Sequence, residues 1–457
     1  MVTDYSATVL AAYRFTQPST QLQNAAFCNV TVSYTHPIME AWLPTAENWN
    51  RRLQAVGGGG WAAGRFFLSY KAMEGALADG YATLTTDAGL ASSRDPAPWA
   101  LVSPGNVNLY NLQNLGSAPL NEASPFYASC SQGGRQGLML TQRYPTAFDN
   151  IAIVMNMLGT YPHTCKIDTL IAAAISSCDG LDGMVDGVIG NGQDVEACLA
   201  TFDPFALAVR SISNCSSSPM AWNISHAAAA VVNATWHGLN PGADLTAAST
   251  SSNGQSGVAA TNCSSSGTCV GAPSELSLPW LNLFINKDPS QTGSSNLAHP
   301  QFNDLVKAGT REFRSIIGTD DADLSAFQKA KLTVKKINNV IPPKSTEEYY
   351  KAVAGNTADG IQVGDFFRHF EVPGLGHCYG GLSGPPTGLF AQLRDWVENG
   401  TAPEQSSVVL NGTGGNRILC PYPRVARFDP TCGDALVERC WSCVGDSHGV
   451  KSPWIEL

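Results

Sequence analysis

The sequence predicts an α/β fold in which a mostly parallel sheet is interrupted by an inserted, disulfide-rich lid. Apolar runs typical of buried strands alternate with helix-compatible segments on both sides of residue 131, as in parallel βαβ units. Between residues 156 and 317 this alternation is replaced by a segment that contains cysteines and a Ser/Thr/Gly-rich run, and strand-like apolar runs resume after residue 331. We therefore expect a core in two parts, residues 1–155 and 318–457, and a lid formed by residues 156–317.

Composition and charge narrow the class of protein. Charged residues make up only 14% of the 457 residues, and 44 Gly with 27 Pro indicate many loops. The formal net charge is -10, so no basic stripe is available to bind nucleic acid. No run reaches the ~18 apolar residues of a membrane span, which argues against a membrane partner.

Cysteines and glycosylation sequons point to an oxidising compartment. The chain holds 13 cysteines, and we expect a secreted glycoprotein. The N-terminus lacks the basic region and the long apolar run of a signal peptide, so we expect the leader to be absent from this chain. The Asn-x-Ser/Thr sequons begin at Asn29, Asn214, Asn223, Asn233, Asn262, Asn399 and Asn411.

The first part of the core is expected to place a glycine loop at the end of a strand. Residues 52–56 predict a strand that runs into Gly57–Gly60, and residues 80–87 predict a second buried strand. Four successive glycines expose backbone N–H groups, which suits the binding of an oxyanion. A flexible turn fits the same stretch equally well.

Ser131 lies in the pattern of a nucleophile elbow. A short apolar run meets a turn of small residues, a helix is expected over residues 138–144, and a further strand over 151–155. Such a corner exposes a serine hydroxyl when the residues two positions to either side are small. Those residues are Ser129 and Gly133, so a serine replaces the usual first glycine. An ordinary Gly-Gly turn with a nearby serine is the alternative.

The lid contains a glycine-spaced acidic run at residues 178–189. Its carboxylates recur three and four residues apart, a spacing that suits a hard, oxygen-seeking cation and differs from that of an EF-hand. A solvated acidic turn is the alternative.

The second part of the core is expected to present a histidine beyond a strand. Strands are predicted at 332–334 and 366–372, and His377 follows the second of them, where catalytic groups of open α/β sheets gather. The order serine, then histidine, matches that of α/β-hydrolases, whereas a solvated loop histidine is the alternative. Helices are expected over 345–353 and 389–398, and an irregular tail after Cys420.

Cysteines flank the two candidate residues symmetrically, because Cys130 precedes Ser131 and Cys378 follows His377. In this the chain resembles the fungal tannase and feruloyl esterase family, and the resemblance covers most of the chain. The matching segments are residues 54–61, 80–87, 130–138, 143–145, 178–189, 341–343, 373–378, 396–400 and 420–423.

The resemblance implies an α/β-hydrolase-like fold and a serine esterase. Ser131 is then the nucleophile and His377 the general base, with the N–H groups of Gln132 and of Gly58 or Gly59 as oxyanion donors.

The acid position of the family holds Asn338 in this sequence. Asparagine at this place in a serine protease costs about 10⁴-fold in kcat, since an amide cannot stabilise the imidazolium. Asp365 or the acidic cluster at residues 320–323 are weaker substitutes. The segments before residue 126 and after residue 155 also look short against the family.

The resemblance further implies a structural Ca²⁺ in the lid and two disulfides. From the residues alone, Cys420 is expected to bond Cys440 or Cys443. The implied ligands are the side chains of Asp179, Asp182 and Asp186 and the carbonyls of Met184 and Val188, and the implied disulfides are Cys130–Cys378 and Cys178–Cys198.

We thus expect a secreted hydrolase of aromatic esters of plant phenolics, feruloyl or galloyl, either small or linked to polysaccharide. The alternative is a catalytically impaired member that serves as a calcium-stabilised binding glycoprotein. Asn338 favours the second interpretation, and the intact Cys130-Ser131 and His377-Cys378 pairs favour the first. Nothing in the sequence specifies an oligomeric state.

Overall fold

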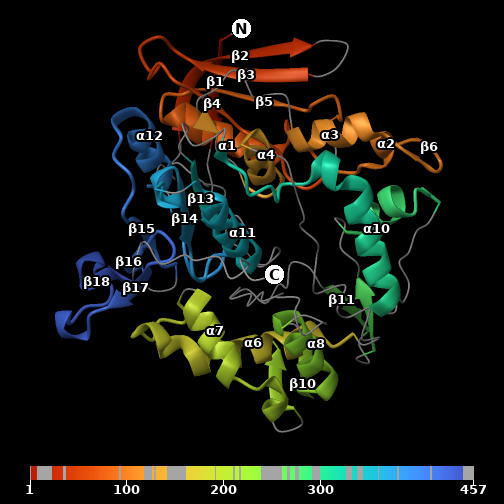
Figure 1. Cartoon of the computed structure of the whole chain (residues 1–457), viewed down its shortest axis with the longest axis vertical. Coiled ribbons are helices and arrows are strands. Elements are labelled where there is room, and N and C mark those ends of the chain that lie inside the picture. The colour runs from red at the N-terminus through yellow and green to blue at the C-terminus, as the bar shows by residue number, and fades with distance from the viewer. Residues whose placement is uncertain are drawn as a thin grey trace.

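The structure of the chain is a computed structural model (Figure 1). It describes residues 2–7, 23–33, 38–91, 94–117, 126–127, 130–141, 161–190, 192–208, 212–215, 218–237, 260–264, 268–272, 277–290, 299–325, 332–336, 343–358, 360–377, 380–386, 388–411 and 414–445. Outside these residues lie Ser129, the strand expected at 151–155, Asn338, Cys378 and both of the segments that look short.

A six-stranded sheet forms the N-terminal end of the molecule, at the top of Figure 1. Its order is β1-β2-β3-β5-β4-β8, antiparallel from β1 to β5 and parallel from β5 through β4 to β8. The prediction of a mostly parallel sheet is therefore wrong for these six strands, because the N-terminal strands pair as antiparallel neighbours. Helix α1 (Phe67–Ala78) connects β4 to β5 and supplies the crossover that parallel neighbours need. The strands predicted at 52–56 and 80–87 are confirmed. The strands are β1 Val2–Ala7, β2 Gln23–Ser33, β3 Ile38–Pro44, β4 Leu53–Ala55, β5 Ala82–Thr86 and β8 Phe126–Tyr127.

Short elements and one longer helix complete the first part of the core. Helix α4 begins at Gln132, six residues before the predicted start, because its buried first turn is held by tertiary hydrogen bonds that outweigh the poor helix propensity of its glycines. The elements are α2 Ala97–Ala100, β6 Leu101–Ser103, β7 Asn106–Val107, α3 Leu109–Ser117 and α4 Gln132–Thr141.

The predicted lid segment forms a helical body at the end opposite the sheet (Figure 1). Its core is built from apolar faces of α6 and α8, where Leu170, Ile224 and Ala228 are fully buried. Helix α10 leaves this body and packs against α3 through Phe313 and Ile317. The elements are α6 Thr164–Cys178, η2 Asp179–Asp182, α7 Gly192–Thr201, η3 Pro204–Leu207, β9 Ile212–Cys215, β10 Ser218–Asn223, α8 His226–His237, β11 Ala260–Cys263, β12 Cys269–Ala272, α9 Ser277–Pro279, the π-helix η4 Trp280–Ile285 and α10 His299–Ile317.

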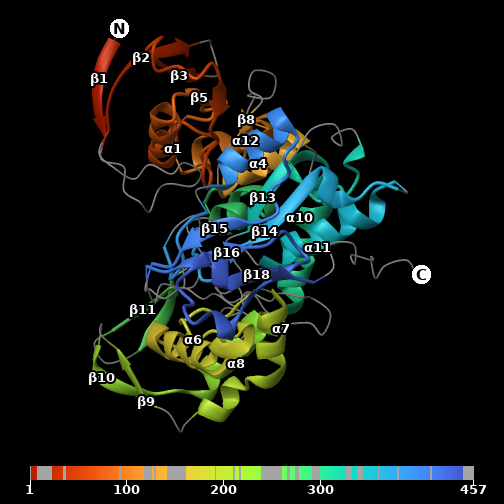
Figure 2. The same cartoon turned by 90° about the vertical axis from the view of Figure 1, so that its left-hand side faces the viewer.

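A second, parallel pair of strands lies between the six-stranded sheet and the lid helices (Figures 1 and 2). Strands β13 and β14 pair in register from Leu332 opposite Phe367 to Lys336 opposite Glu371. The predicted strands and helices of this part are confirmed within one to three residues at their ends. The elements are β13 Leu332–Lys336, α11 Pro343–Asn356, η6 Val363–Asp365, β14 Phe367–Glu371 and α12 Leu389–Asn399.

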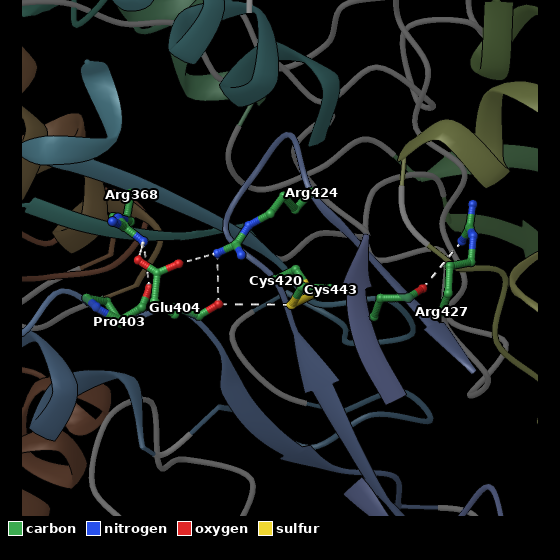
Figure 3. Close-up of a disulfide and its surroundings, with 8 residues drawn as sticks. Arg368, Pro403, Glu404, Cys420, Arg424, Arg427 and Cys443 are labelled. Carbon is green, nitrogen blue, oxygen red and sulfur yellow. Dashed lines mark hydrogen bonds and ion pairs between the residues drawn. A yellow bond between two sulfur atoms is a disulfide. The ribbon is translucent and has the colours of Figure 1, made fainter. Parts of the chain in front are cut away.

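Residues 420–445 contain two paired strands, so the prediction of an irregular tail is wrong for this part of the chain. Strands β17 and β18 pair, and the Cys420–Cys443 disulfide ties them to β16. Beside this disulfide Arg368 and Arg424 both bind the carboxylate of Glu404 (Figure 3). These strands are short and lack long apolar runs, so the sequence did not predict them. The elements are β15 Ser406–Val409, β16 Asn416–Leu419, β17 Val425–Phe428, η7 Pro430–Cys432, η8 Glu438–Cys440 and β18 Trp441–Val444.

Disulfides recur through the described residues. The predicted Cys178–Cys198 bond is confirmed, and of the two partners predicted for Cys420 the structure has Cys443. Two further bonds join Cys263 to Cys269 and Cys432 to Cys440. Among the helices that are described, none is long and apolar enough to cross a membrane.

Candidate active site

Ser131 occupies the corner between β8 and α4. Its φ is 57°, in the left-handed region that residues other than glycine rarely adopt. Gly133 N–H donates to Cys130 O at 3.0 Å and Arg135 N–H donates to Ser131 O at 3.0 Å, which closes the turn. Strand, strained serine and helix form the backbone of a nucleophile elbow, as the sequence predicts.

The glycine loop after β4 packs directly against the first turn of α4. Gly58 O accepts a hydrogen bond from Gly133 N–H at 3.0 Å, and Gly58 N–H donates to Gln136 Oε1 at 2.9 Å. A Cβ on Gly58 would lie 1.9 Å from Ala62 O, so only glycine fits there. The loop is therefore closely packed and hydrogen-bonded to α4, which favours a fixed loop over a flexible turn.

Gln136 joins the glycine loop to α4, a role that was not predicted from the sequence. Its side chain is fully buried, and Nε2 donates to Ala63 O and to Leu115 O, each at 3.0 Å. Gln132, one helical turn earlier, also donates from Nε2 to Leu115 O, at 2.8 Å. This pair of glutamines at helical spacing is the signal that could have identified the residue.

The three oxyanion donors that the family resemblance implies differ in whether their backbone N–H groups already bind an acceptor in the protein. The N–H of Gly58 is used by Gln136, and the N–H of Gly59 donates to Ala62 O at 3.1 Å. The N–H of Gln132, in the first turn of α4, makes no hydrogen bond to another described residue. Among the three predicted donors, Gln132 alone has a backbone N–H at a helix N-terminus that binds no acceptor among the described residues. This N–H could therefore donate to an oxyanion.

An aromatic cluster connects the glycine loop to the end of the lid segment. Trp61, which ends the loop, stacks on Phe284 with ring centroids 5.2 Å apart and on Trp280 at 6.4 Å. Trp99 and Phe313 complete the cluster. The glycine loop is consequently held by α4 on one side and by η4 and α10 on the other.

His377 lies on the loop that follows β14. This loop turns at Gly374, which has a φ of 73° and whose carbonyl accepts hydrogen bonds from the N–H groups of Leu382 at 2.9 Å and Ser383 at 3.2 Å. Burial lowers the pKa of His377 to about 4. The imidazole is therefore neutral, and able to accept a proton, at every pH above that value.

The strand that precedes the predicted acid position pairs with the strand that precedes His377. Asn338 itself is outside the described residues, but β13 ends at Lys336, two residues earlier, and pairs in parallel with the strand that precedes His377. Residues that follow adjacent parallel strands gather at one sheet edge. The weaker substitutes have local partners: Asp320 pairs with Arg314 at 2.9 Å, and Asp365 accepts from Gln362 N–H.

Cys130, next to Ser131, is disulfide-bonded. Its predicted partner, Cys378, lies outside the described residues, so the pairing stays a prediction. Cys28 is free in the structure.

The acidic run of the lid folds into a tight loop. Both oxygens of Asp179 accept hydrogen bonds from the successive N–H groups of residues 186–188, at 2.8 to 3.2 Å. Asp182 Oδ1 accepts from Met184 N–H at 3.0 Å. The loop is thus organised by its own carboxylates, and the alternative of a solvated acidic turn is wrong, because Asp179 and Asp182 are buried.

Arg417 on β16 shares the buried charge of this loop. Its guanidinium pairs with Asp182 Oδ2, lies 3.3 Å from Asp186 Oδ2, and stacks on Trp441 at 4.4 Å. Burial and the charge of Asp179 raise the pKa of Asp186 to about 6. In the part of the chain that is described, no three His, Cys, Asp or Glu side chains are grouped so as to hold a metal ion. The carboxylate oxygens fit a hard cation by their chemistry, but Arg417 bridges two of them.

The acidic loop also supports the histidine loop. Val188 is fully buried, and a Cβ on Gly374 would lie 2.9 Å from Val188 Cγ2. On the other side, Leu382 Cδ1 lies 3.3 Å from where a Cβ on Gly187 would be. The acidic loop therefore packs directly against the loop that carries His377.

Comparison with known proteins decides the family. The family described as tannase and feruloyl esterase matches residues 28–155 and 152–440. The chain belongs to the tannase and feruloyl esterase family. Its members are carboxylic ester hydrolases, which gives the general class of reaction and implies an ester substrate.

Two relatives show how far sequence similarity extends across the tannase and feruloyl esterase family. A probable feruloyl esterase of Arthroderma benhamiae is 29% identical over 495 residues, covering 94% of this chain and 88% of the relative. An uncharacterized esterase of Xanthomonas campestris pv. campestris is 29% identical over 513 residues, covering 92% and 85%.

Solved structures of similar shape confirm the α/β-hydrolase fold. Tannin acyl hydrolase from Aspergillus niger matches with a TM-score of 0.80 at 20% identity, covering 99% of this chain and 92% of that chain. Feruloyl esterase B from Aspergillus oryzae matches with a TM-score of 0.64 at 22% identity, covering 93% and 92%. At these identities the likeness extends to the fold alone.

Proposed function

We propose that this member of the family hydrolyses aromatic esters of plant phenolics, with Ser131 as the nucleophile. The observation that carries the proposal is the left-handed backbone of Ser131 at a strand-to-helix corner, a strained conformation that serine adopts at a cost of order 1–3 kcal/mol. Similarity to a probable feruloyl esterase supports our choice of feruloyl and related hydroxycinnamoyl esters ahead of galloyl esters.

The proposed reaction is acyl transfer in two steps. Ser131 Oγ attacks the ester carbonyl, its proton passes to the neutral imidazole of His377, and the proton then goes to the leaving alcohol. Water attacks the acyl-enzyme in the second step and releases the acid. The N–H of Gln132 is the best supported donor to the oxyanion, since it starts α4 and has no acceptor among the described residues.

A catalytically impaired member is the second candidate, and Asn338 is the observation that favours it. An amide at the acid position holds the imidazole but leaves the imidazolium uncompensated. In this case the chain binds phenolic ligands without turning them over.

Hydrolysis of methyl ferulate and methyl gallate tests both candidates. The unmodified chain is compared with Ser131→Ala, with Asn338→Asp, and with Ser407→Ala as a matched control, because Ser407 is exposed and its hydroxyl donates to Glu438 Oε2 at 2.8 Å. Turnover that Ser131→Ala abolishes and Ser407→Ala preserves supports the esterase.

Other outcomes separate the two candidates. Activity that appears only with Asn338→Asp supports the impaired member. Turnover that survives Ser131→Ala rules out the proposed nucleophile, and a folded protein that is inactive in every form leaves only the binding function.

We also propose that the acidic loop holds a structural Ca²⁺ through the side chains and carbonyls that the family resemblance implies. Of the three buried or half-buried carboxylates, those of Asp182 and Asp186 pair with a single guanidinium, and the remaining negative charge supports a divalent cation. Metal analysis of the purified protein and thermal shifts with CaCl₂ against MgCl₂ test this. Asp182→Asn should abolish the shift with Ca²⁺, and equal shifts with both salts would count against a specific site.

Secretion is proposed on the disulfides and sequons. The described disulfides fit an oxidising compartment. The test is to express the protein in a fungal host and to treat it with endoglycosidase, which should remove glycans. An unglycosylated intracellular product would contradict secretion.

A further inference from the structure

Asn411 makes an unusual set of contacts to the histidine loop, which we define as residues 373–384. It lies just after β15, two residues beyond Val409. Its Nδ2 donates to Gly381 O and to Ser383 O, each at 3.1 Å, and its backbone N–H donates to Leu382 O at 2.7 Å. One residue thus binds three consecutive carbonyls of the histidine loop.

These three residues hold the base of the same loop. The N–H groups of Leu382 and Ser383 both donate to Gly374 O, three residues before His377. Gly381 packs so tightly there that a Cβ on it would lie 2.2 Å from Gly374 O. The contacts therefore run without a gap from Asn411, through residues 381–383, to the turn that sets the position of His377.

We propose that Asn411 is a positioning residue for the general base His377, and that a glycan on it would loosen the histidine loop. This inference rests on the proposed function, because it assigns His377 as the base. Both hydrogens of Nδ2 are used, so neither Asp nor Ala can replace the contacts. Asn411 also begins an Asn-Gly-Thr sequon, and a glycan bond would replace one of those two hydrogens.

The test compares Asn411→Ala with Asn399→Ala. Asn399 is a matched control, since it is also an exposed sequon asparagine but donates to Asp395 within its own helix, at 2.6 Å. Loss of two hydrogen bonds of ordinary strength predicts a fall of roughly 10-fold in kcat for Asn411→Ala, with little change in KM. The acid limb of kcat/KM should also move to higher pH as His377 becomes solvated, whereas a purely structural role would lower Tm and leave that limb in place.

Hydrogen exchange separates this inference from the proposed function. Faster exchange of residues 374–384 in Asn411→Ala, but not in Asn399→Ala, is expected whether or not the chain is active. Unchanged exchange in that segment, or unchanged kcat and acid limb in an active enzyme, would overturn the positioning role.

The glycan is tested with protein from a glycosylating host. Thr413→Ala removes the sequon and keeps Asn411, so it should restore the kcat of any preparation in which mass spectrometry finds Asn411 occupied. An occupied preparation with the full kcat of Thr413→Ala would contradict the claim about the glycan.

Discussion

Replacing Gln136 with leucine is expected to damage both stability and catalysis. The side chain is fully buried between the glycine loop, α3 and α4, and leucine has a similar volume but no hydrogen-bonding groups. The N–H of Gly58 and the carbonyl of Ala63 would lose the partner that the structure gives them, whereas Leu115 O would keep Gln132.

The magnitude follows from these two orphaned groups. A buried backbone group without a partner costs about 1–3 kcal/mol, so Gln136→Leu should lower the free energy of unfolding by roughly 2–6 kcal/mol. The glycine loop would lose its anchor on α4, and kcat should fall by roughly 10- to 100-fold, on the scale of a misplaced oxyanion site.

Thermal unfolding and ester hydrolysis measure the two effects. Gln392→Leu is the matched control, because Gln392 donates one exposed hydrogen bond, to Gln405 O at 2.9 Å, far from the glycine loop in the sequence. A Tm and kcat for Gln136→Leu that equal those of the Gln392→Leu control would refute the claim that Gln136 anchors the loop.

Three further predictions concern the base, a disulfide and the acidic loop. His377 must be neutral to accept a proton, and its pKa is lowered to about 4, so kcat/KM should stay constant down to pH 5 and fall below about pH 4. Asn338→Asp should move this acid limb to higher pH. An acid limb near the ordinary pKa of histidine in the unmodified chain would contradict the argument that burial lowers the pKa. Cys178→Ser together with Cys198→Ser should lower stability by roughly 3 kcal/mol, measured by denaturant unfolding, and no change would show that the loop closure contributes nothing. A chelator should lower the Tm of the unmodified chain but not of Asp182→Asn, and equal shifts would argue against a metal in this loop.

The confirmed parts of the sequence analysis are those that depend on local pattern. Residues 82–86 are apolar or β-branched and form a fully buried strand, since burial on both faces leaves no alternation to misread. The elbow at Ser131 is marked by small residues that a tight corner requires, and the backbone there has the expected left-handed turn. The Cys178–Cys198 bond, which the family resemblance implied and local pattern did not, is also confirmed.

The errors arise where non-local contacts replace local propensity. The start of α4 is rich in glycine, but Gln136 and Gly133 bond the glycine loop and hold the helix from Gln132. The C-terminal strands are only four residues long, and they are held by the Cys420–Cys443 disulfide and by a buried cluster that includes Ile418 and Trp441, contacts that join separate strands.

Local sequence patterns predict the strand-to-helix corner at Ser131, the histidine beyond β14 and the acidic run at residues 178–189, since each is encoded within a short window. The family is instead indicated by matching segments spread over most of the chain. The tertiary structure adds that Gln136 ties the glycine loop to α4, that Arg417 shares the charge of the acidic loop, and that Asn411 contacts the histidine loop. These contacts join residues that lie far apart in the chain, and their polar groups are satisfied only when separate elements pack together. The spacing of Gln132 and Gln136 could mark the second glutamine, but no local pattern specifies the residues that these side chains bind.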